Sequence, residues 1–232
     1  MKQKCAVITG ASRGIGAAAA ERFAAGGWNL ALSCVRSRET LEELARRLHA
    51  KWGITCLTYM GDMGREEAVR EFFGRIEESF GGAGVLVNNA GISRVGLLEE
   101  MSLEEWEEVM RTNVTSAFLC ARAAIPYMLR RKSGSIINVS SVWGCVGASC
   151  EAAYSASKGA VNALTRALAK ELAPSGIAVN AVACGAVDTD MNACFSPEER
   201  QEIAEEIPAG RFALPSEAAD LIYTLAERPS YL

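Results

Sequence analysis

The sequence is poor in histidine and has no paired-cysteine motif. Its 232 residues include a single histidine, His49, which lies in a polar stretch expected to be helical. One histidine supports neither a zinc site nor a Ser-His-Asp hydrolase triad. Eight cysteines are present, mostly in apolar segments, and no two are spaced as Cys-x-x-Cys. We therefore expect reduced, buried thiols, no metal, and a solvated His49 without a role.

Long hydrophobic runs and an excess of basic charge are also lacking. No segment approaches the roughly 18 apolar residues that a membrane span requires. Met1 leads into an apolar, strand-like run without the pattern of a signal peptide. The net charge of −4 and the pI near 5.3 argue against nucleic acid or an anionic membrane as the main partner. A cytoplasmic location is the expectation.

What the sequence does contain is a regular alternation of apolar runs and helical patterns. Its composition, 50% hydrophobic and 22% charged, is ordinary for a globular protein, and we expect one domain over residues 1–232. The alternation predicts an α/β fold with a doubly wound, Rossmann-type parallel sheet between two helical layers. The expected strands are 4–9, 28–34, 54–60, 85–87, 136–140 and 177–182, and the main expected helices run to Ala25 and over 39–51, 65–80, 102–130, 154–172 and 215–227.

Two details of this pattern concern helix ends. In the long helix 102–130, Ser102 and Glu105 have the spacing of a capping box, and Pro126 is expected to kink or interrupt its end. Ser196 and Pro197 predict the start of another helix inside the looser segment 184–210.

A glycine-rich turn follows the first expected strand and opens the first helix. It reads Gly-Ala-Ser-Arg-Gly-Ile-Gly over residues 10–16, after Thr9. Glycines allow the backbone to approach a pyrophosphate, and the amides and dipole of a helix N-terminus favour its negative charge. This arrangement predicts a dinucleotide-binding site.

A second group of polar side chains closes the fifth expected strand and enters the following helix. Ser140 and Ser141 end the strand, while Tyr154 and Lys158 are one helical turn apart on the same face. The ordinary pKa of a phenol is roughly 10. A nearby cation favours the phenolate and lowers that pKa toward working pH, so the group suits proton transfer.

Taken in order, these motifs resemble the short-chain dehydrogenase/reductase family over essentially the whole chain. The resemblance also rests on Asp62, on Asn-Asn-Ala-Gly at 88–91 and on Asn113 within Thr-Asn-Val. It is nearest to the bacterial 3-oxoacyl-[acyl-carrier-protein] reductases. The stretch 143–151 is more like the elongation factor P 5-aminopentanone reductases, which reduce a ketone carried on a protein lysine.

The resemblance implies a role for each of four catalytic residues. Tyr154 would donate a proton to the substrate carbonyl, and Lys158 would lower the Tyr154 pKa and hold the nicotinamide ribose. Ser141 would hydrogen-bond the carbonyl oxygen. Asn113, midway along the long helix, would anchor a water that links Lys158 to solvent.

The resemblance also implies an NADP(H) site. A carboxylate that would select NADH by binding the ribose 2′-hydroxyl is absent between Ser33 and Arg38, and Arg13 adds positive charge. The expected cofactor-binding residues are Gly10, Ser12, Arg13, Gly14, Ile15, Gly16, Ser33, Arg36, Asp62, Met63, Asn89, Ala90, Gly91, Tyr154, Lys158, Gly185, Val187 and Thr189.

The sequence departs from the family pattern in two places. Cys184 stands where similar enzymes have proline, which leads us to expect a thiol beside the nicotinamide and a mobile lid over 185–207. The chain stops at Leu232, where relatives continue into a seventh strand, so we expect a sheet that lacks its last strand.

The expected function is NADPH-dependent ketone reduction by a homo-tetramer or homo-dimer, with a 3-oxoacyl group on acyl-carrier protein as the first expected substrate. Arg130, Arg131 and Lys132 could dock an acidic carrier, although Ser175 stands where carrier-protein reductases commonly have a basic residue. The alternatives are reduction of a protein-linked ketone of the elongation factor P type and a noncatalytic nucleotide-binding sensor or scaffold.

Overall fold

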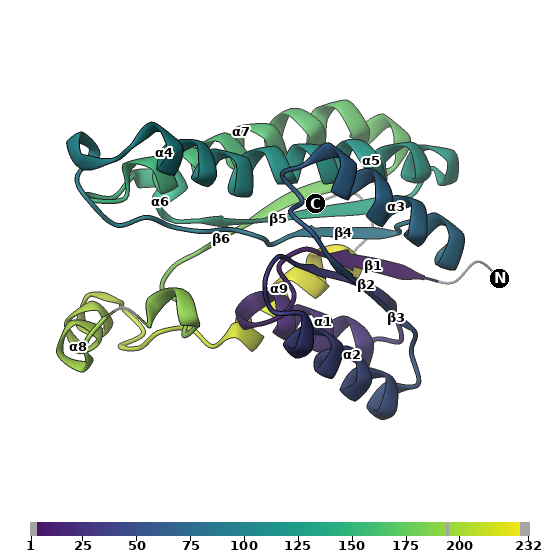
Figure 1. The fold of residues 1–232 in the computed structure, drawn as a ribbon, viewed down its shortest axis with the longest axis horizontal. Helices are drawn as coiled ribbons and strands as arrows, with labels where there is room; N and C mark the ends of the chain where they lie inside the picture. Colours follow the sequence, from purple (N-terminus) through teal and green to yellow (C-terminus); the bar gives the residue numbers. More distant parts are fainter. Residues whose placement is uncertain (1–3, 194, 228–232) are drawn as a thin grey trace.

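A single parallel sheet forms the centre of the computed structural model, which describes residues 4–193 and 195–227 (Figure 1). The strand order is β3-β2-β1-β4-β5-β6. The strands are β1 (Cys5–Ile8), β2 (Asn29–Cys34), β3 (Cys56–Met60), β4 (Val85–Asn88), β5 (Gly134–Ser141) and β6 (Ile177–Cys184). The order reverses at β1, so the carboxyl ends of β1 and β4 flank the position where such sheets bind their ligands.

Helices cover both faces of the sheet, which confirms the predicted Rossmann-type, three-layer architecture (Figure 1). One layer contains α1 (Gly14–Ala25), α2 (Arg38–Trp52) and α9 (Pro215–Glu227). The other contains α3 (Glu66–Phe80), α4 (Leu103–Met110), α5 (Ser116–Arg131) and α7 (Ala152–Leu172). The remaining helices are α6 (Trp143–Val146), α8 (Pro197–Glu206) and the short η1 (Leu98–Glu100), η3 (Ala173–Ser175) and η4 (Asp190–Asn192).

The hydrophobic core consists of two clusters, one on each face of the sheet. Phe23, Leu30 and Leu48 belong to the cluster beneath α1 and α2. Phe72 and Leu86 belong to the cluster beneath α3 and α5. Burial on both faces explains why the strands are apolar along their length instead of alternating.

The predicted long helix is interrupted, but at a different residue from the one expected. Its capping box is confirmed, since Ser102 accepts from the Glu105 amide and the Glu105 carboxylate accepts from the Ser102 amide. A π-helical turn, η2 (Arg111–Thr115), then separates α4 from α5. The expected interruption near Pro126 is wrong, because α5 continues through this residue to Arg131.

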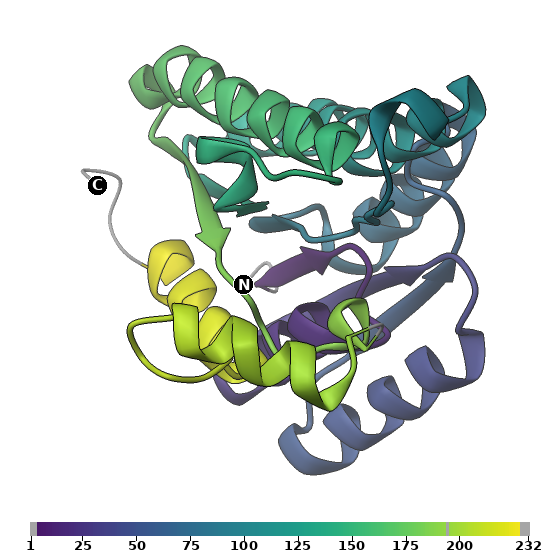
Figure 2. The ribbon, with the colours of Figure 1, turned by 90° about the vertical axis from the view of Figure 1, so that its left-hand side faces the viewer.

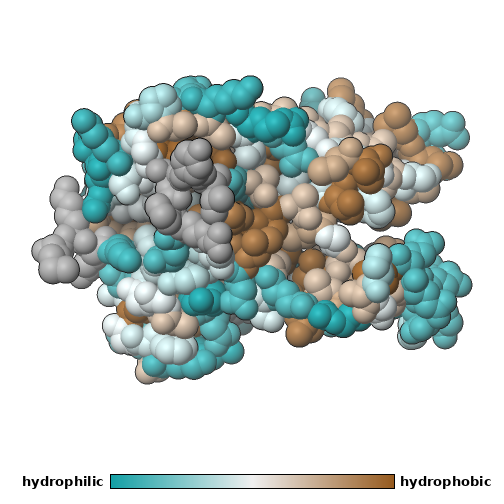
Figure 3. Space-filling model, turned by 180° about the vertical axis from the view of Figure 1, so that it is seen from behind, coloured by the Kyte–Doolittle hydropathy of each residue, from teal (hydrophilic) through white to brown (hydrophobic). Residues whose placement is uncertain are grey.

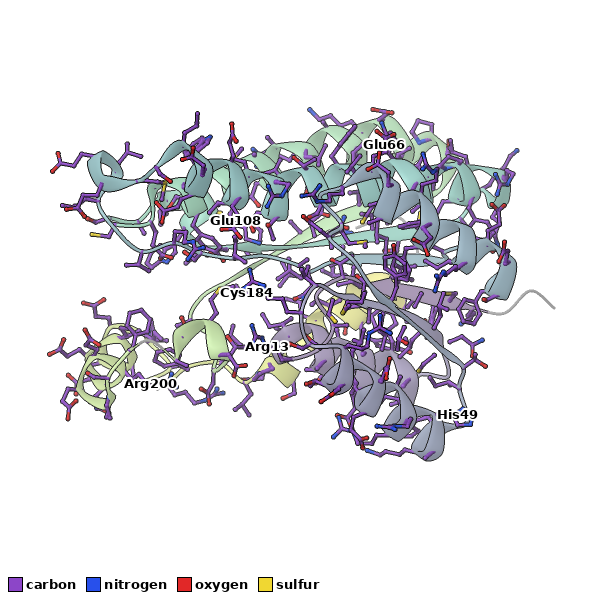
Figure 4. The ribbon with its side chains drawn as sticks, in the orientation of Figure 1. Arg13, His49, Glu66, Glu108, Cys184 and Arg200 are labelled. Carbon is purple, nitrogen blue, oxygen red and sulfur yellow. The ribbon has the colours of Figure 1, made fainter. Side chains whose placement is uncertain are left out.

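Two smaller expectations are corrected. His49 is exposed, yet its Nδ1 donates to the carbonyl oxygen of Ile54 at 2.9 Å, so it helps to close the turn after α2. Figure 4 places it at the far end of α2, away from Cys184. All seven described cysteines are free, as expected, but Cys145 and Cys150 are exposed instead of buried.

The sheet edges are formed by β3 and β6 within the described residues. The expectation of a missing final strand concerns the chain beyond α9, and residues 228–232 lie outside the described part. None of the helices in the described ranges combines the length and apolarity of a membrane span.

Candidate functional site

The glycine-rich turn packs backbone to backbone against the end of β4. Gly10 has φ +64°, and a Cβ added there would lie 2.9 Å from the Ala90 Cα. A Cβ on Gly16 would lie 2.4 Å from the Gly10 carbonyl oxygen. Side chains at these two positions would therefore force the turn apart, which explains why both are glycine.

Two polar side chains hold the turn against the residues after β4. The Thr9 hydroxyl accepts from the amides of Asn89 (3.1 Å) and Ala90 (3.0 Å). The Asn89 side-chain amide donates to the carbonyls of Thr9 (2.9 Å) and Gly10 (3.0 Å). Because both amide hydrogens of Asn89 are used, its side chain positions the turn. The sequence motif contained Thr9, but nothing in it indicated this bridging role.

The structure brings Ser141, Tyr154 and Lys158 together at the carboxyl end of β5. Ser141 is the last residue of this strand, and its hydroxyl acts on the Tyr154 phenol, whose pKa it lowers. Lys158 lies one turn further along α7, with Nζ 5.6 Å from the centre of the Tyr154 ring. Its Nζ donates to the Val139 carbonyl oxygen at 2.8 Å. Ser140 packs behind this group, with its hydroxyl 3.4 Å from the Lys158 carbonyl oxygen.

Burial dominates the proton affinities of this group. It raises the pKa of Tyr154 to about 12; the hydrogen bond from Ser141 works in the opposite direction, and the charges of Glu151 and Cys184 raise it further. Burial also lowers the pKa of Lys158 to about 8. The expected lowering of the Tyr154 pKa is therefore not found in the free protein, because desolvation outweighs the favourable contacts.

Asn113 connects the segment after β4 to α7. It lies in the π turn and is 2% exposed. Its Oδ1 accepts from the Ile92 amide at 2.8 Å, and its Nδ2 donates to the Ile92 carbonyl oxygen and the Ser157 hydroxyl, both at 2.9 Å. The Ser157 hydroxyl in turn donates to the Tyr154 carbonyl oxygen at 2.7 Å. No sequence signal had indicated Ser157.

Gly91 separates Asn113 from Lys158. A Cβ at this position would lie 3.4 Å from both the Asn113 Oδ1 and the Lys158 Nζ. Gly91 thus lies between the carboxamide and the ammonium group, and a Cβ there would make ordinary van der Waals contact with both.

The residues predicted to bind the adenosine part of the cofactor differ in exposure and in whether their polar groups already have partners. The Ser33 hydroxyl is buried and has no hydrogen-bond partner among the described residues. Arg13 is exposed and forms an ion pair with Asp190 at 3.3 Å, and Arg36 is also exposed. The Met63 side chain is buried in the core, so only its backbone is available to a ligand.

The Asp62 carboxylate is already engaged. Its Oδ1 accepts from the Gly64 amide at 2.8 Å. Its Oδ2 lies 3.3 Å from Arg111 Nε and 3.7 Å from Arg65 Nε. An adenine amino group would have to share this carboxylate with two arginines.

The segment after β6 contains the last three predicted cofactor-binding residues, Gly185, Val187 and Thr189. Thr189 meets the glycine-rich turn, since a Cβ on Gly14 would lie 3.1 Å from its Cγ2. Val187 is buried and forms a β-bridge with Ala213. A Cβ added to Gly185 would have no neighbour within 4 Å. Ser12 and Ile15 are half-buried in the turn itself. Arg13 and Cys184 lie on the same side of the molecule, at the carboxyl ends of the strands (Figure 4).

Beyond these strand ends, α8 stands apart from the two helical layers (Figure 1), and in the view from that side it lies in front of the layer that contains α9 (Figure 2). Ser196 and Glu199 form a capping box that starts α8, as predicted. Arg200 connects α8 to the segments beneath it, through an ion pair with Asp188 at 2.7 Å and a cation–π contact with Phe212 at 4.5 Å. Arg200 thus attaches α8 to the segments that follow β6 and precede α9.

Exposed apolar side chains border that opening. In the view from behind, a hollow separates the part that contains α4 and α6 from the part that contains α8, and hydrophobic surface lies on both sides (Figure 3). On the α6 side it includes Trp143 and Val146, and on the segment after β4 it includes Val95, Leu97 and Leu98. An apolar patch beside polar catalytic groups is typical of a binding site for an organic substrate.

Comparison with known proteins agrees with this geometry. The short chain dehydrogenase family model matches residues 4–200. The uncharacterized oxidoreductase YmfI of Bacillus subtilis is 42% identical over 230 residues, covering 99% of this chain and 94% of its own. The 3-oxoacyl-[acyl-carrier-protein] reductases FabG of Staphylococcus aureus and Aquifex aeolicus are 40% and 38% identical, covering 96% and 100% of this chain and 90% and 94% of theirs. The chain belongs to the short chain dehydrogenase family and is an oxidoreductase that acts on CH–OH or ketone groups.

Proposed function

We propose that this oxidoreductase uses NADPH to reduce a ketone that is carried on a protein. The observation that carries the proposal is the convergence of Ser141, Tyr154 and Lys158 at the end of β5, next to a glycine turn that fits a dinucleotide. A noncatalytic sensor would have no need to keep all three groups together with Asn113.

The proposed proton donor is Tyr154. Its pKa of about 12 keeps the phenol protonated at neutral pH, so a proton is available for the carbonyl oxygen. Ser141 would donate a hydrogen bond to the same oxygen as negative charge develops on it. When bound, the reduced nicotinamide supplies the hydride. The ammonium of Lys158 would stabilise the phenolate left on Tyr154 after proton transfer.

The residues present fit a dinucleotide with a 2′-phosphate. Without side chains at Gly10 and Gly16, the backbone amides at the start of α1 are open to a pyrophosphate. The unpartnered hydroxyl of Ser33 lies at the end of β2, where a bound adenosine ribose would meet it. Arg13, and less strongly Arg36, would add charge for the phosphate.

The first substrate candidate is a 3-oxoacyl group on acyl-carrier protein. Its support is the activity named for the two FabG relatives and the apolar border of the opening, which could accept an acyl chain. The second candidate is a ketone linked to a protein amine. It is favoured by one observation, the carboxylate of Glu151 beside Tyr154.

A homo-dimer or homo-tetramer is also proposed. The outer side of α5 carries the exposed apolar side chains Phe118 and Leu129, which a second copy could cover. Its mass in solution, measured by light scattering, tests this assembly.

The decisive experiment is NADPH oxidation with purified protein, using 3-oxoacyl-acyl-carrier protein and small neutral ketones. Tyr154→Phe should lower kcat by about 10²–10⁴-fold, the usual contribution of a positioned acid, while NADPH binding stays nearly intact. Tyr127→Phe is the matched control, since this tyrosine lies on α5 and hydrogen-bonds Arg131. A Tyr154→Phe variant with the unchanged rate would remove the proton-donor assignment.

A further inference from the structure

Glu151 is a half-buried carboxylate that the proposed reaction does not use. It is the N-cap residue of α7 and lies three positions before Tyr154 in the sequence. Its Oε1 accepts from the Ser93 hydroxyl at 2.5 Å. Within the described ranges, no lysine or arginine forms an ion pair with it.

A purely structural role explains only part of this arrangement. The hydrogen bond to Ser93 ties the segment after β4 to the start of α7, but the Gly96 amide already does so by donating to the Cys150 carbonyl oxygen at 2.8 Å. The second carboxylate oxygen of Glu151 has no hydrogen-bond partner in the described part of the chain. This half-buried carboxylate thus acts on the Tyr154 phenol without an ion-pair partner among the described residues.

Glu151 lies at the same end of α7 as the proposed proton donor. It is the N-cap residue of this helix, and Tyr154 lies in the first turn. The effect of the carboxylate reaches the phenol, since the Glu151 charge raises the Tyr154 pKa. The exposed side chains of Val95 and Val146 offer apolar surface at the same opening.

We propose that Glu151 is a specificity-determining residue, which binds a cationic group, such as a protonated amine, a few carbon atoms from the ketone of the substrate. This inference rests on the proposed ketone reduction and distinguishes between its two candidates. A neutral 3-oxoacyl chain has no group for this carboxylate, whereas an amine-linked ketone does. Partial burial strengthens the attraction for a cation and the repulsion of an anion.

The test compares three methyl ketones of the same length. Three methylenes separate the carbonyl from a trimethylammonium group in the first, from a neutral tert-butyl group in the second and from a carboxylate in the third. With saturating NADPH, kcat/KM of the unaltered protein should be about tenfold higher for the cationic than for the neutral ketone, and lowest for the anionic one, as expected for a partly buried charge pair.

Glu151→Gln isolates the charge, because glutamine keeps an oxygen that can accept from Ser93. The ratio of kcat/KM for the cationic and neutral ketones should fall to about one in this variant. Glu78→Gln, an exposed position on α3, is the control and should keep the ratio of the unaltered protein. An unaltered protein without cation preference, or an unchanged ratio in Glu151→Gln, would overturn the proposal.

The same experiments distinguish a failure of the proposed ketone reduction from a failure of the Glu151 cation site. If none of the three ketones supports NADPH oxidation, ketone reduction is refuted for this class. Calorimetric titration of the NADPH complex with the trimethylammonium ketone then tests Glu151 alone. Binding that is lost in Glu151→Gln supports its cation site, whereas absent or equal binding in both proteins rejects it.

Discussion

The ammonium group of Lys158 donates a hydrogen bond to the backbone carbonyl oxygen of Val139, 2.8 Å away, inside the protein at the end of β5. This carbonyl is a neutral partner, so the positive charge is buried without a counter-charge. The cost of that burial is what lowers the pKa of Lys158 to about 8. Lys158 can thus change its charge close to physiological pH.

Activity should therefore depend on pH through Lys158. We expect kcat/KM for ketone reduction to fall as pH rises through about 8, because the free enzyme loses the charge that stabilises the Tyr154 phenolate. Tyr154 itself stays protonated well above that pH. A profile that stays flat from about pH 7 to pH 10, the range that spans the Lys158 titration, would contradict this assignment.

Stability should change in the opposite direction. Between a folded pKa of about 8 and the unfolded value of about 10.4, the unfolded state binds the proton of Lys158 and the folded state does not. The contribution of Lys158 to the free energy of unfolding therefore rises with pH across this window and is lost as pH falls through the folded pKa. Urea unfolding of the Lys158→Met variant should lack this rise.

The coenzyme preference should favour NADPH. Removing the exposed guanidinium in Arg13→Ala should lower the ratio of kcat/KM for NADPH over NADH by about tenfold or more, because a charged hydrogen bond to the 2′-phosphate is lost. Arg46→Ala is the control, since the exposed Arg46 lies on α2 and forms an ion pair with Glu43. A preference of the unaltered protein for NADH would refute the assignment.

The Thr9 hydroxyl should matter for stability as well as for cofactor binding. Thr9→Val removes the acceptor for the amides of Asn89 and Ala90, and should cost about 1–3 kcal/mol in the free energy of unfolding and weaken NADPH binding. Thr9→Ser keeps the hydroxyl and should restore most of both. If valine and serine behaved alike in denaturant titration and in NADPH binding, the hydrogen bonds would have no such role.

Cys184 should report on the cofactor. It is half-buried, burial raises its pKa, and the neighbouring Lys158 acts against that rise. We expect slow alkylation in the free protein and protection by NADPH, measured by peptide mapping. The exposed Cys145 provides an internal reference for reagent reactivity. Equal labelling of Cys184 with and without NADPH would show that it does not lie against the bound cofactor.

Features encoded by neighbouring residues could be predicted from the sequence. The capping boxes at Ser102 and Ser196 each depend on residues three positions apart, and both are present in the structure. The bounds of α9 agree with the predicted 215–227 because Pro215 marks its start. The alternation of strands and helices was equally visible, since burial on both faces makes every strand apolar.

Features that depend on distant partners could not be predicted. The π turn at Asn113 is accompanied by hydrogen bonds to Ile92 and Ser157, which lie 21 and 44 residues away in the chain. The contact between Glu151 and Ser93 spans 58 residues. The pKa of Tyr154 was expected to fall because the sequence reveals a neighbouring cation but not the extent of burial.

The π turn also fixes how α5 is rotated relative to α4. Each residue of an α-helix turns the chain by about 100°, so shortening η2 by one residue would rotate the whole of α5 by about that angle. Phe118 and Leu129, two exposed apolar side chains of α5, would then point in new directions. One turn of backbone thus sets both the position of Asn113 and the direction in which the outer surface of α5 faces.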